Sequence, residues 1–289
     1  MDDAVAVFST VRRRLFGIAY RMLGTAAEAE DIVQEVWLRW QTCDRSAVRE
    51  PAAFLATAAT RLSINVLQSA HHRRETYIGP WLPEPVNTTD DPTLGAERGE
   101  ALGFAMLLLL EKLTPTERAA YILREAFDYP YEQIALIVQL KEPATRQLVS
   151  RARKKLATEH RAPMVSTEQR RLLAAFLQAA QSGDVTALEE LFASDVVSYS
   201  DGNGAKLAAR IPVFGRSRVA KFVAAFSHHF WAGKAIDWVE LNGQHAVTLT
   251  EDDGTVTTAL TMTVGGDGIQ QLMWMMNPDK LHRVASARP

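Results

Sequence analysis

Six polar side chains suited to binding nucleic acid lie near the middle of the chain. They are Arg146, Gln147, Ser150, Arg151, Arg153 and Lys154. An arginine can donate two hydrogen bonds to guanine and a glutamine can pair with adenine, while lysine neutralises phosphates. The apolar residues among them, Leu148, Val149, Ala152 and Leu156, fall on one stripe of a helix and must face a core. The pattern therefore predicts a helix whose solvent face fits the major groove of DNA.

Two shorter helices precede this basic helix and favour the DNA-binding interpretation. Thr114 can cap the first, with Pro115 at its first position and Glu117 three residues after the cap. A second helix is expected over 131–138, and after a four-residue turn the third opens with Pro143. Two helices joined by a short turn indicate a helix-turn-helix. A lone basic helix is more often an ordinary solvated surface, but the preceding helix and turn reverse that preference.

The totals of the sequence exclude some classes of protein. At 289 residues the chain is long for one domain and natural for two or three. A net charge of −2 does not suit a protein that coats nucleic acid, so any DNA contact must come from a local patch. The single cysteine, Cys43, excludes an internal disulfide framework and fits a reducing compartment. Because the apolar run at 105–110 is too short to span a bilayer and no signal-type run opens the chain, we expect a cytoplasmic protein.

The N-terminal part predicts a helical bundle with one surface suited to a partner. A helix over 5–23 ends at Gly24, and Thr25 with Glu28 can form a capping box for a helix that runs to Trp40. One face of this second helix is apolar and includes Trp37. The other face carries Asp31, Gln34, Glu35, Leu38 and Arg39. An apolar side chain among charges is typical of a binding surface, although a merely solvated face fits the pattern equally well.

Two further segments precede the basic helix. A helix over 51–69 presents Arg61 and Asn65 beside its apolar stripe. Residues 76–100 are acidic and rich in proline, which indicates a linker. Trp81 lies within this linker between Pro80 and Pro83, and so large an apolar ring is expected to dock onto a folded part of the protein.

After residue 163 the pattern changes to a mixed helix and strand domain. Helices are expected over 166–181, 185–192 and 215–230, and strands over 195–200, 235–241, 246–250, 255–264 and 269–276. Helices followed by an antiparallel meander predict an α+β domain whose curved sheet surrounds a cavity. Candidate cavity residues are Met262, Met273, Trp274, Met275 and Met276, although an ordinary core explains them at least as well.

The helical part resembles the bacterial extracytoplasmic-function (ECF) sigma factors over roughly residues 5–160. The resemblance is carried by AEDIVQEVWLRW, by LTPTERAAYILREAFDYPYEQIA and by RQLVSRARKKL, in that order. It implies two all-α sigma modules, region 2 over 1–75 and a region 4 helix-turn-helix over 101–162, joined by the linker at 76–100. In this family region 2 binds the β′ clamp helices of RNA polymerase and reads the promoter −10 element. Region 4 contacts the β flap and reads the −35 element.

The resemblance also implies roles for the residues named above. Asp31, Gln34, Glu35, Leu38 and Arg39 would bind core polymerase, and Arg61 and Asn65 would belong to the −10 module. The six polar residues of the basic helix would read the −35 element. The protein would then need no cofactor or metal and would catalyse no reaction itself.

Residues 163–289 resemble the SnoaL-like domains of the NTF2-like cone fold, and three short motifs indicate the sigma subgroup that carries this domain as a C-terminal extension. The motif residues are Trp81, Leu82, Pro83, Glu84 and Pro85; Asp201, Gly202, Gly204 and Lys206; and Asn277, Pro278, Asp279, Lys280 and Leu281. The resemblance implies that the extension replaces a separate anti-sigma protein. The two glycines would allow close backbone approach, and Lys206 or Lys280 would pair with linker acids such as Glu84. Asn203 stands where the subgroup has glycine.

Two other functions stay open at this point. One is a one-component regulator in which the C-terminal cavity senses a small ligand and the helix-turn-helix alone binds an operator. The other is a fused isomerase or cyclase, for which Asp201, Asp237, His228, His229 and His245 are candidate acids and bases. No spacing among these five residues marks a dyad, a triad or a metal site.

Overall fold

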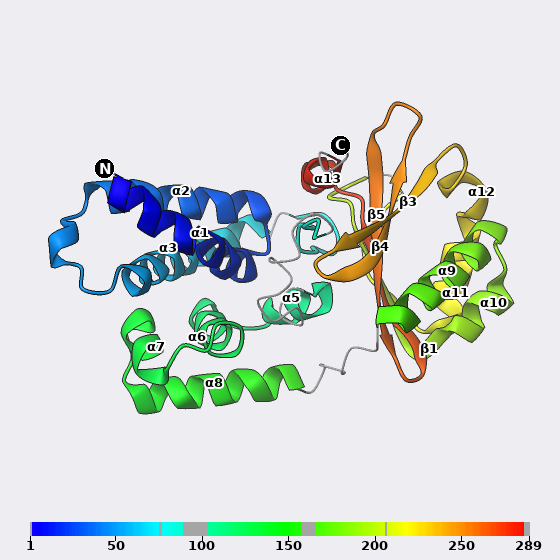
Figure 1. The fold of residues 1–289 in the computed structure, drawn as a ribbon. Coiled ribbons are helices and arrows are strands. Elements are labelled where there is room, and N and C mark those ends of the chain that lie inside the picture. Colours follow the sequence, from blue (N-terminus) through cyan, green and yellow to red (C-terminus); the bar gives the residue numbers. More distant parts are fainter. Residues whose placement is uncertain (1, 75–76, 89–102, 158–165, 206, 286–289) are drawn as a thin grey trace. The chain divides into compact units, whose positions relative to one another are not determined.

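The computed structural model describes residues 2–74, 77–88, 103–157, 166–205 and 207–285, which divide into two compact units (Figure 1). The described residues of the first unit are 2–74 and 106–157. Those of the second are 77–88, 103–105, 166–205 and 207–285, so the described part of the linker belongs to the second unit. No helix in these ranges is long and apolar enough to cross a membrane.

The first part of unit one is a bundle of three long helices. They are α1 (Asp2–Leu23), α2 (Ala26–Thr42) and α3 (Pro51–Arg74), with a short 3-10 helix at Arg45–Ala47. The amide of Gly24 donates to Tyr20 O at 2.7 Å and ends α1 where the sequence predicts. The indole Nε1 of Trp40 donates to Ala4 O at 3.1 Å, which ties α2 to the start of α1.

The two predicted capping boxes have different outcomes. At Thr114 both halves form: the amide of Glu117 donates to Thr114 Oγ1 at 3.3 Å, and the amide of Thr114 donates to Glu117 Oε2 at 3.0 Å. At Thr25 the prediction is wrong, because the hydroxyl donates to Glu28 Oε2 at 2.5 Å and caps no backbone N–H. An ionised carboxylate is a strong acceptor, and its bond to the Thr25 hydroxyl takes the place of the cap.

The helix-turn-helix predicted around residues 115–157 is present. It consists of α6 (Pro115–Glu125), α7 (Tyr131–Val138) and α8 (Glu142–Ala157), preceded by α5 (Phe104–Leu110). Gln139, in the left-handed region with φ 59°, ends α7. The predicted stripe of α8 is buried, and α8 begins one residue earlier than expected, so Pro143 is its second residue. Proline fits there because the first turn of a helix has no intrahelical use for its missing N–H.

The second unit is built on one six-stranded sheet in the order β2-β1-β6-β5-β4-β3. The strands are β1 (Phe192–Asp201), β2 (Val213–Phe214), β3 (Ala235–Leu241), β4 (Gln244–Thr250), β5 (Val256–Gly265) and β6 (Gly268–Met275). Strands β3 to β6 form the predicted antiparallel meander, whereas β1 pairs with β6 in parallel. The sheet is therefore mixed: β1 comes before the meander in the chain and pairs with its last strand, β6, while β2 pairs antiparallel on the other side of β1.

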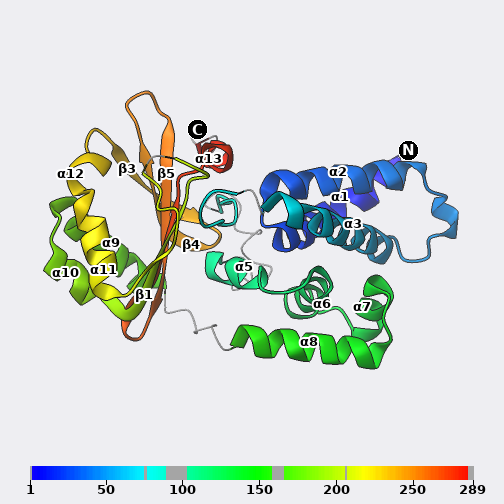
Figure 2. The same cartoon turned by 180° about the vertical axis from the view of Figure 1, so that it is seen from behind.

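Helices cover one face of this sheet, as both views show (Figures 1 and 2). They are α9 (Ser166–Ser182), α10 (Val185–Leu191), α11 (Arg216–Ala225) and α12 (Ser227–Phe230). The helix predicted over 215–230 thus breaks at Phe226 into α11 and α12. The sequence prediction lacked α13 (Pro278–Ala285), which packs against β5. In both views α13 and the segment 77–88 lie on the side of the sheet away from α9 to α12.

Aromatic side chains form the core between the sheet and these helices. The ring of Trp274 packs 5.9 Å from Phe176 and 5.4 Å from Phe230, centroid to centroid, and its Nε1 donates to Ser198 Oγ at 3.0 Å. Met262 and Met276, predicted as candidate cavity residues, belong to the same core with Trp274, and Met273 and Met275 are buried as well. These methionines therefore act as core residues in the structure.

Candidate functional site

The solvent face of α8 carries all six polar residues predicted to read DNA, and each of them is exposed. Two of the six are already bonded within the first unit. Arg146 pairs with Glu142 at 2.6 Å and its guanidinium lies 4.5 Å from the ring centroid of Tyr131. Arg153 pairs with Glu125 of α6 at 2.7 Å. The side chains of Gln147, Ser150, Arg151 and Lys154 form no hydrogen bond or ion pair with the described residues, so they present their polar groups outward.

The capping box of α6 also anchors α8. Lys155 Nζ lies 2.9 Å from Glu117 Oε2, the carboxylate that caps Thr114. Burial raises the pKa of Glu117, but the hydrogen bonds from Lys155 and the Thr114 amide outweigh burial and leave the pKa below its ordinary value. One carboxylate thus closes a helix start and holds the last turn of α8, which fixes the direction of the basic face.

The surface predicted on α2 is present. Asp31, Gln34, Leu38 and Arg39 are exposed, and Glu35 is partly exposed and pairs with Arg39 at 2.8 Å. Leu38 is 50% exposed, which is high for an apolar side chain between charged neighbours. Trp37, predicted in the buried stripe, is only partly buried, and its ring packs 4.9 Å from Phe8.

The two residues predicted on α3 differ in their surroundings. Asn65 is exposed. Arg61 instead donates from Nη2 to Leu136 O at 2.9 Å and from Nε to Ile137 O at 3.1 Å, both at the end of α7. Local patterns cannot predict this contact, because it joins residues separated by 75 and 76 positions.

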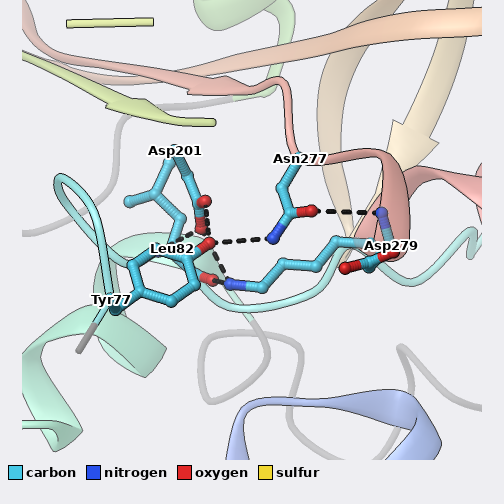
Figure 3. A network of polar contacts seen from close by, with 6 residues as sticks. Tyr77, Leu82, Asp201, Asn277 and Asp279 are labelled. Carbon is cyan, nitrogen blue, oxygen red and sulfur yellow. Dashed lines mark hydrogen bonds and ion pairs between the residues drawn. The ribbon is translucent and has the colours of Figure 1, made fainter. Parts of the chain in front are cut away.

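The three short motifs of the linker, the β1 end and the C-terminal helix meet in one polar network (Figure 3). Asp201, at the end of β1, has no exposed surface. Its Oδ2 accepts from the amide of Leu82 at 2.7 Å and from Lys280 Nζ at 2.8 Å, and its Oδ1 accepts from the hydroxyl of Tyr77. The backbone is held too, since the amide of Met276 donates to Asp201 O at 2.7 Å. One buried carboxylate therefore binds the linker at two points.

Lys280 completes this network from α13. Its Nζ also donates to Leu82 O at 2.6 Å and lies 4.3 Å from the ring centroid of Trp81, with the side chain 8% exposed. Leu82 is thus held at both backbone groups: its amide donates to Asp201 and its carbonyl accepts from Lys280. The docking predicted for Trp81 is observed, and the ion pair of Lys280 is formed with Asp201. Lys206, the other predicted partner of the linker acids, lies outside the described residues.

Asn277 and Tyr77 form the outer part of the network. Asn277 Nδ2 donates to the Tyr77 hydroxyl at 2.9 Å, while its Oδ1 accepts from the amide of Asp279 at 3.1 Å and so begins α13. Burial raises the pKa of Tyr77 well above its ordinary value, and the hydrogen bond to Asp201 raises it further. The phenol therefore stays protonated and serves as a donor to Asp201.

The glycine motif shapes the loop after Asp201. A Cβ on Gly202 would lie 2.3 Å from the Cβ of Ala208, so the close approach predicted there is made within the loop itself. Gly204 has φ 93°, and a Cβ there would lie 3.6 Å from Ile78 of the linker. Asn203 also has positive φ, at 44°, a conformation that asparagine adopts more readily than most residues.

A second contact of the linker was not predicted. The amide of Val86 donates to Asn242 Oδ1 at 3.0 Å, and the amide of Asn242 donates to Val86 O at 2.9 Å. The amide of Thr88 then donates to Glu240 O at 3.0 Å, and Asn87 pairs antiparallel with Leu241. Residues 86–88 are therefore held beside the end of β3 by one antiparallel bridge and its backbone hydrogen bonds. In the sequence, Asn242-Gly243 predicts a turn and nothing more.

The residues considered for catalysis are dispersed over the second unit. Asp201 ends β1 and Asp237 lies in β3, with three strands between them, and Asp237 accepts from Thr250 Oγ1 at 3.1 Å. His228 and His229 are exposed on α12, and His245 lies in β4. Among the described residues no group of three or more His, Cys, Asp or Glu could hold a metal ion. Asp237 and His245 lie on adjacent strands but do not face each other in the register, where Asp237 pairs with Thr248 and His245 with Glu240.

Comparisons with known proteins agree with this arrangement. Family models match for Sigma-70 region 2 over residues 7–74, for Sigma-70, region 4 over 104–156 and for a SnoaL-like domain over 166–285. The ECF RNA polymerase sigma factor SigJ of Mycobacterium tuberculosis is 34% identical over 96% of this chain and 92% of its own length. The probable ECF RNA polymerase sigma factor SigI of the same species is 31% identical over 69% of this chain and 70% of its own length.

A solved structure shares the fold along nearly the whole chain. The crystal structure of the Mycobacterium tuberculosis extracytoplasmic function sigma factor SigJ superimposes with a TM-score of 0.76 at 31% identity. The match covers 96% of this chain and 98% of that chain.

Proposed function

Because this chain belongs to the ECF RNA polymerase sigma factors, we propose that it binds core RNA polymerase, directs it to a narrow set of promoters and catalyses no reaction itself. In this proposal region 2 lies within residues 1–75, the linker within 76–100, region 4 within 101–162 and a SnoaL-like regulatory domain within 163–289. The observation that carries the regulatory part is the buried network of Asp201 and Lys280, which holds the linker on the SnoaL-like domain.

We propose that α8 reads the −35 element through its outward residues. Gln147 and Arg151 have side chains without a partner among the described residues, and Arg and Gln are the side chains that best distinguish guanine and adenine. Lys154 would neutralise a phosphate. The bonds from α8 to Glu125 and Glu117 support this role, because a helix fixed to its neighbour presents base contacts in a defined register.

We propose that α2 binds the β′ clamp helices of the polymerase, with Leu38 as the apolar contact inside a charged rim of Asp31, Gln34, Glu35 and Arg39. The helix-turn-helix would contact the β flap. Arg61 and Asn65 of α3 would bind the −10 region. The exposure of Leu38 and the partly exposed ion pair beside it support a surface that is buried only when a partner binds.

We propose that the SnoaL-like domain regulates the sigma modules in cis through the linker. The linker joins region 2 to region 4 in sequence, so a domain that binds it controls how freely the two modules can separate. The contacts at Leu82 and Val86 support this role, because both fix backbone groups of the linker and not side chains alone.

The deciding experiment is transcription with purified core polymerase. Genomic fragments are transcribed with core enzyme alone, with the wild-type chain, or with a Leu38→Asp variant, and the transcripts are mapped. Promoter-specific initiation with the wild type, and its loss with Leu38→Asp, is the expected result. Operator binding by the free protein without any effect on polymerase would instead identify a one-component regulator, and turnover of a small substrate would identify a fused enzyme.

A further inference from the structure

The contact between Arg61 and the end of α7 joins two parts of the first unit that have separate tasks in the proposed function. The last four carbonyls of a helix have no intrahelical partner, and the helix dipole favours a cation beside them. Arg61 supplies that cation to α7, through two hydrogen bonds to consecutive carbonyls, Leu136 O and Ile137 O. A residue of the first bundle thus caps the helix that precedes the basic helix α8.

Two further arginines make contacts of the same kind between these parts. Arg14 of α1 donates to Phe127 O at 3.0 Å and lies 4.9 Å from the ring centroid of Tyr129. In the reverse direction, Arg118 of α6 donates to Met22 O, at the end of α1, at 2.7 Å. The three guanidinium groups thus bind backbone carbonyls of the opposite part, and the parts are held by specific polar bonds as well as by packing.

Of these three arginines, Arg61 is the most accessible to DNA. Arg118 is buried and Arg14 is partly buried, whereas Arg61 is exposed even while it makes both bonds. The donors it uses, Nε and Nη2, are the pair that would form a bidentate contact with a phosphate or a guanine. One guanidinium cannot aim the same two donors at α7 and at DNA together. A phosphate is an anion and a carbonyl is neutral, so the contact with DNA is the stronger of the two.

We propose that Arg61 has two mutually exclusive partners, the carbonyls that end α7 in the free protein and promoter DNA in the bound state. DNA binding at α3 then releases α7, and with it the α8 that packs on α7. This inference rests on the proposed function, since it takes α3 as a DNA-binding surface. Coupling between two binding events is reciprocal. The contact of Arg61 with α7 therefore weakens DNA binding, and DNA binding weakens that contact by the same factor.

The test measures the distance between the two parts in the full chain. Two exposed glutamines, Gln41 at the end of α2 and Gln133 of α7, are changed to cysteine in a Cys43→Ser background, and spin labels report their distance distribution. Arg61→Ala is compared with Asn65→Ala. Asn65 is a neighbour of Arg61 on α3 and is also expected to bind DNA, but among the described residues it forms no bond with α7. Gln68→Ala serves as the matched surface control.

Arg61→Ala is expected to raise the separated population about fivefold, equivalent to about 1 kcal/mol. Asn65→Ala and Gln68→Ala should leave the distribution unchanged. Arg61→Lys, which keeps the charge but loses the paired donors, should fall between the wild type and Arg61→Ala. An unchanged distribution in Arg61→Ala, with normal folding by circular dichroism, overturns the proposal.

The second arm adds single-stranded DNA of random sequence, about 12 nucleotides long, at low salt, with binding followed by fluorescence anisotropy. DNA should lengthen the distance in the wild type and in Gln68→Ala, and should add little in Arg61→Ala. DNA that fails to bind, or that binds without changing the distance, overturns the sharing of Arg61. Loss of promoter-specific transcription in Asn65→Ala reports separately on the DNA-binding role of α3, so failure of the two ideas can be told apart.

Discussion

Replacing Lys280 by methionine should release the linker from the SnoaL-like domain without removing the hydrophobic volume of the side chain. In the wild type the ammonium binds Asp201 Oδ2 at 2.8 Å and Leu82 O at 2.6 Å, and it lies over Trp81. Both charged side chains are almost fully buried, at 8% and 0% exposure. Removing one partner of a buried ion pair typically costs about 3 to 5 kcal/mol, because the remaining charge is left uncompensated.

The structure places this change near the lower end of that range. Asp201 keeps the hydrogen bonds from Tyr77 and from the amide of Leu82, so its carboxylate is not stripped of all donors. Loss of the cation over Trp81 adds roughly 1 kcal/mol to the cost of the substitution. We therefore expect linker docking to weaken by about 3 kcal/mol, which is roughly a 150-fold shift in the docking equilibrium.

Hydrogen exchange at the amide of Leu82 measures this shift directly, because that N–H is covered by Asp201 only while the linker is docked. Lys280→Met should accelerate its exchange by roughly 150-fold. Lys234→Met is the matched control, since Lys234 also lies over an aromatic ring and donates to Thr257 but forms no ion pair with a carboxylate among the described residues. Wild-type exchange at Leu82 in a folded Lys280→Met protein would refute the reasoning.

A double-mutant cycle gives an independent check. Asp201→Asn alone removes the carboxylate that faces the buried Lys280 ammonium, whereas Asp201→Asn combined with Lys280→Met removes both charges of the pair. The double variant should therefore lose about 2 kcal/mol less unfolding free energy than the two single variants lose together. Chemical denaturation of the full chain measures all three losses. Strict additivity would mean that the two side chains do not interact as the structure describes.

Four further substitutions separate the roles of other side chains. Arg151→Ala should cost about 1 to 3 kcal/mol of −35 affinity at selected base pairs, whereas Lys154→Ala should weaken all sequences alike, as fluorescence anisotropy with mutated duplexes would reveal. Asn242→Ala should speed amide exchange at Val86 and Thr88 while leaving Leu82 protected, and equal acceleration at all three would contradict two separate anchors. Because the pKa of Glu117 lies below its ordinary 4.5, its stabilising contribution is complete above that pH and is lost as the pH falls through the lowered pKa. Lys155→Met should move this acid loss to higher pH in denaturation experiments, and an unchanged acid profile would argue against the Lys155 contact.

The features that the sequence predicts well depend on neighbouring residues. The buried stripe of α8 and the capping box at Thr114 depend on spacings of three and four, which a helix converts directly into contacts. The same logic failed at Thr25, where the hydroxyl bonds to the carboxylate of Glu28 and leaves the backbone uncapped. Local pattern identifies which groups are near each other, but not which of two competing hydrogen bonds forms.

The contacts that the sequence could not supply join distant parts of the chain. Leu82 meets Asp201 across 119 positions and Lys280 across 198, and only the similarity of short motifs to a sigma subgroup suggested that these segments belong together. Asp201 was also a candidate catalytic acid, and its complete burial under the linker became evident only in the structure. The parallel pairing of β1 with β6 escaped prediction for the same reason, since alternation defines a strand but not its neighbour.

The two anchors of the linker also limit how the chain can change in length. Most surface connections tolerate an inserted or deleted residue, because their backbone is free to bulge outward. Here the amides of Leu82 and Val86 are both fixed, and the three residues between them include Pro83 and Pro85, whose φ angles are locked. A single insertion or deletion at 83–85 would force one anchor to detach, so this short stretch is expected to keep its length even where its side chains vary.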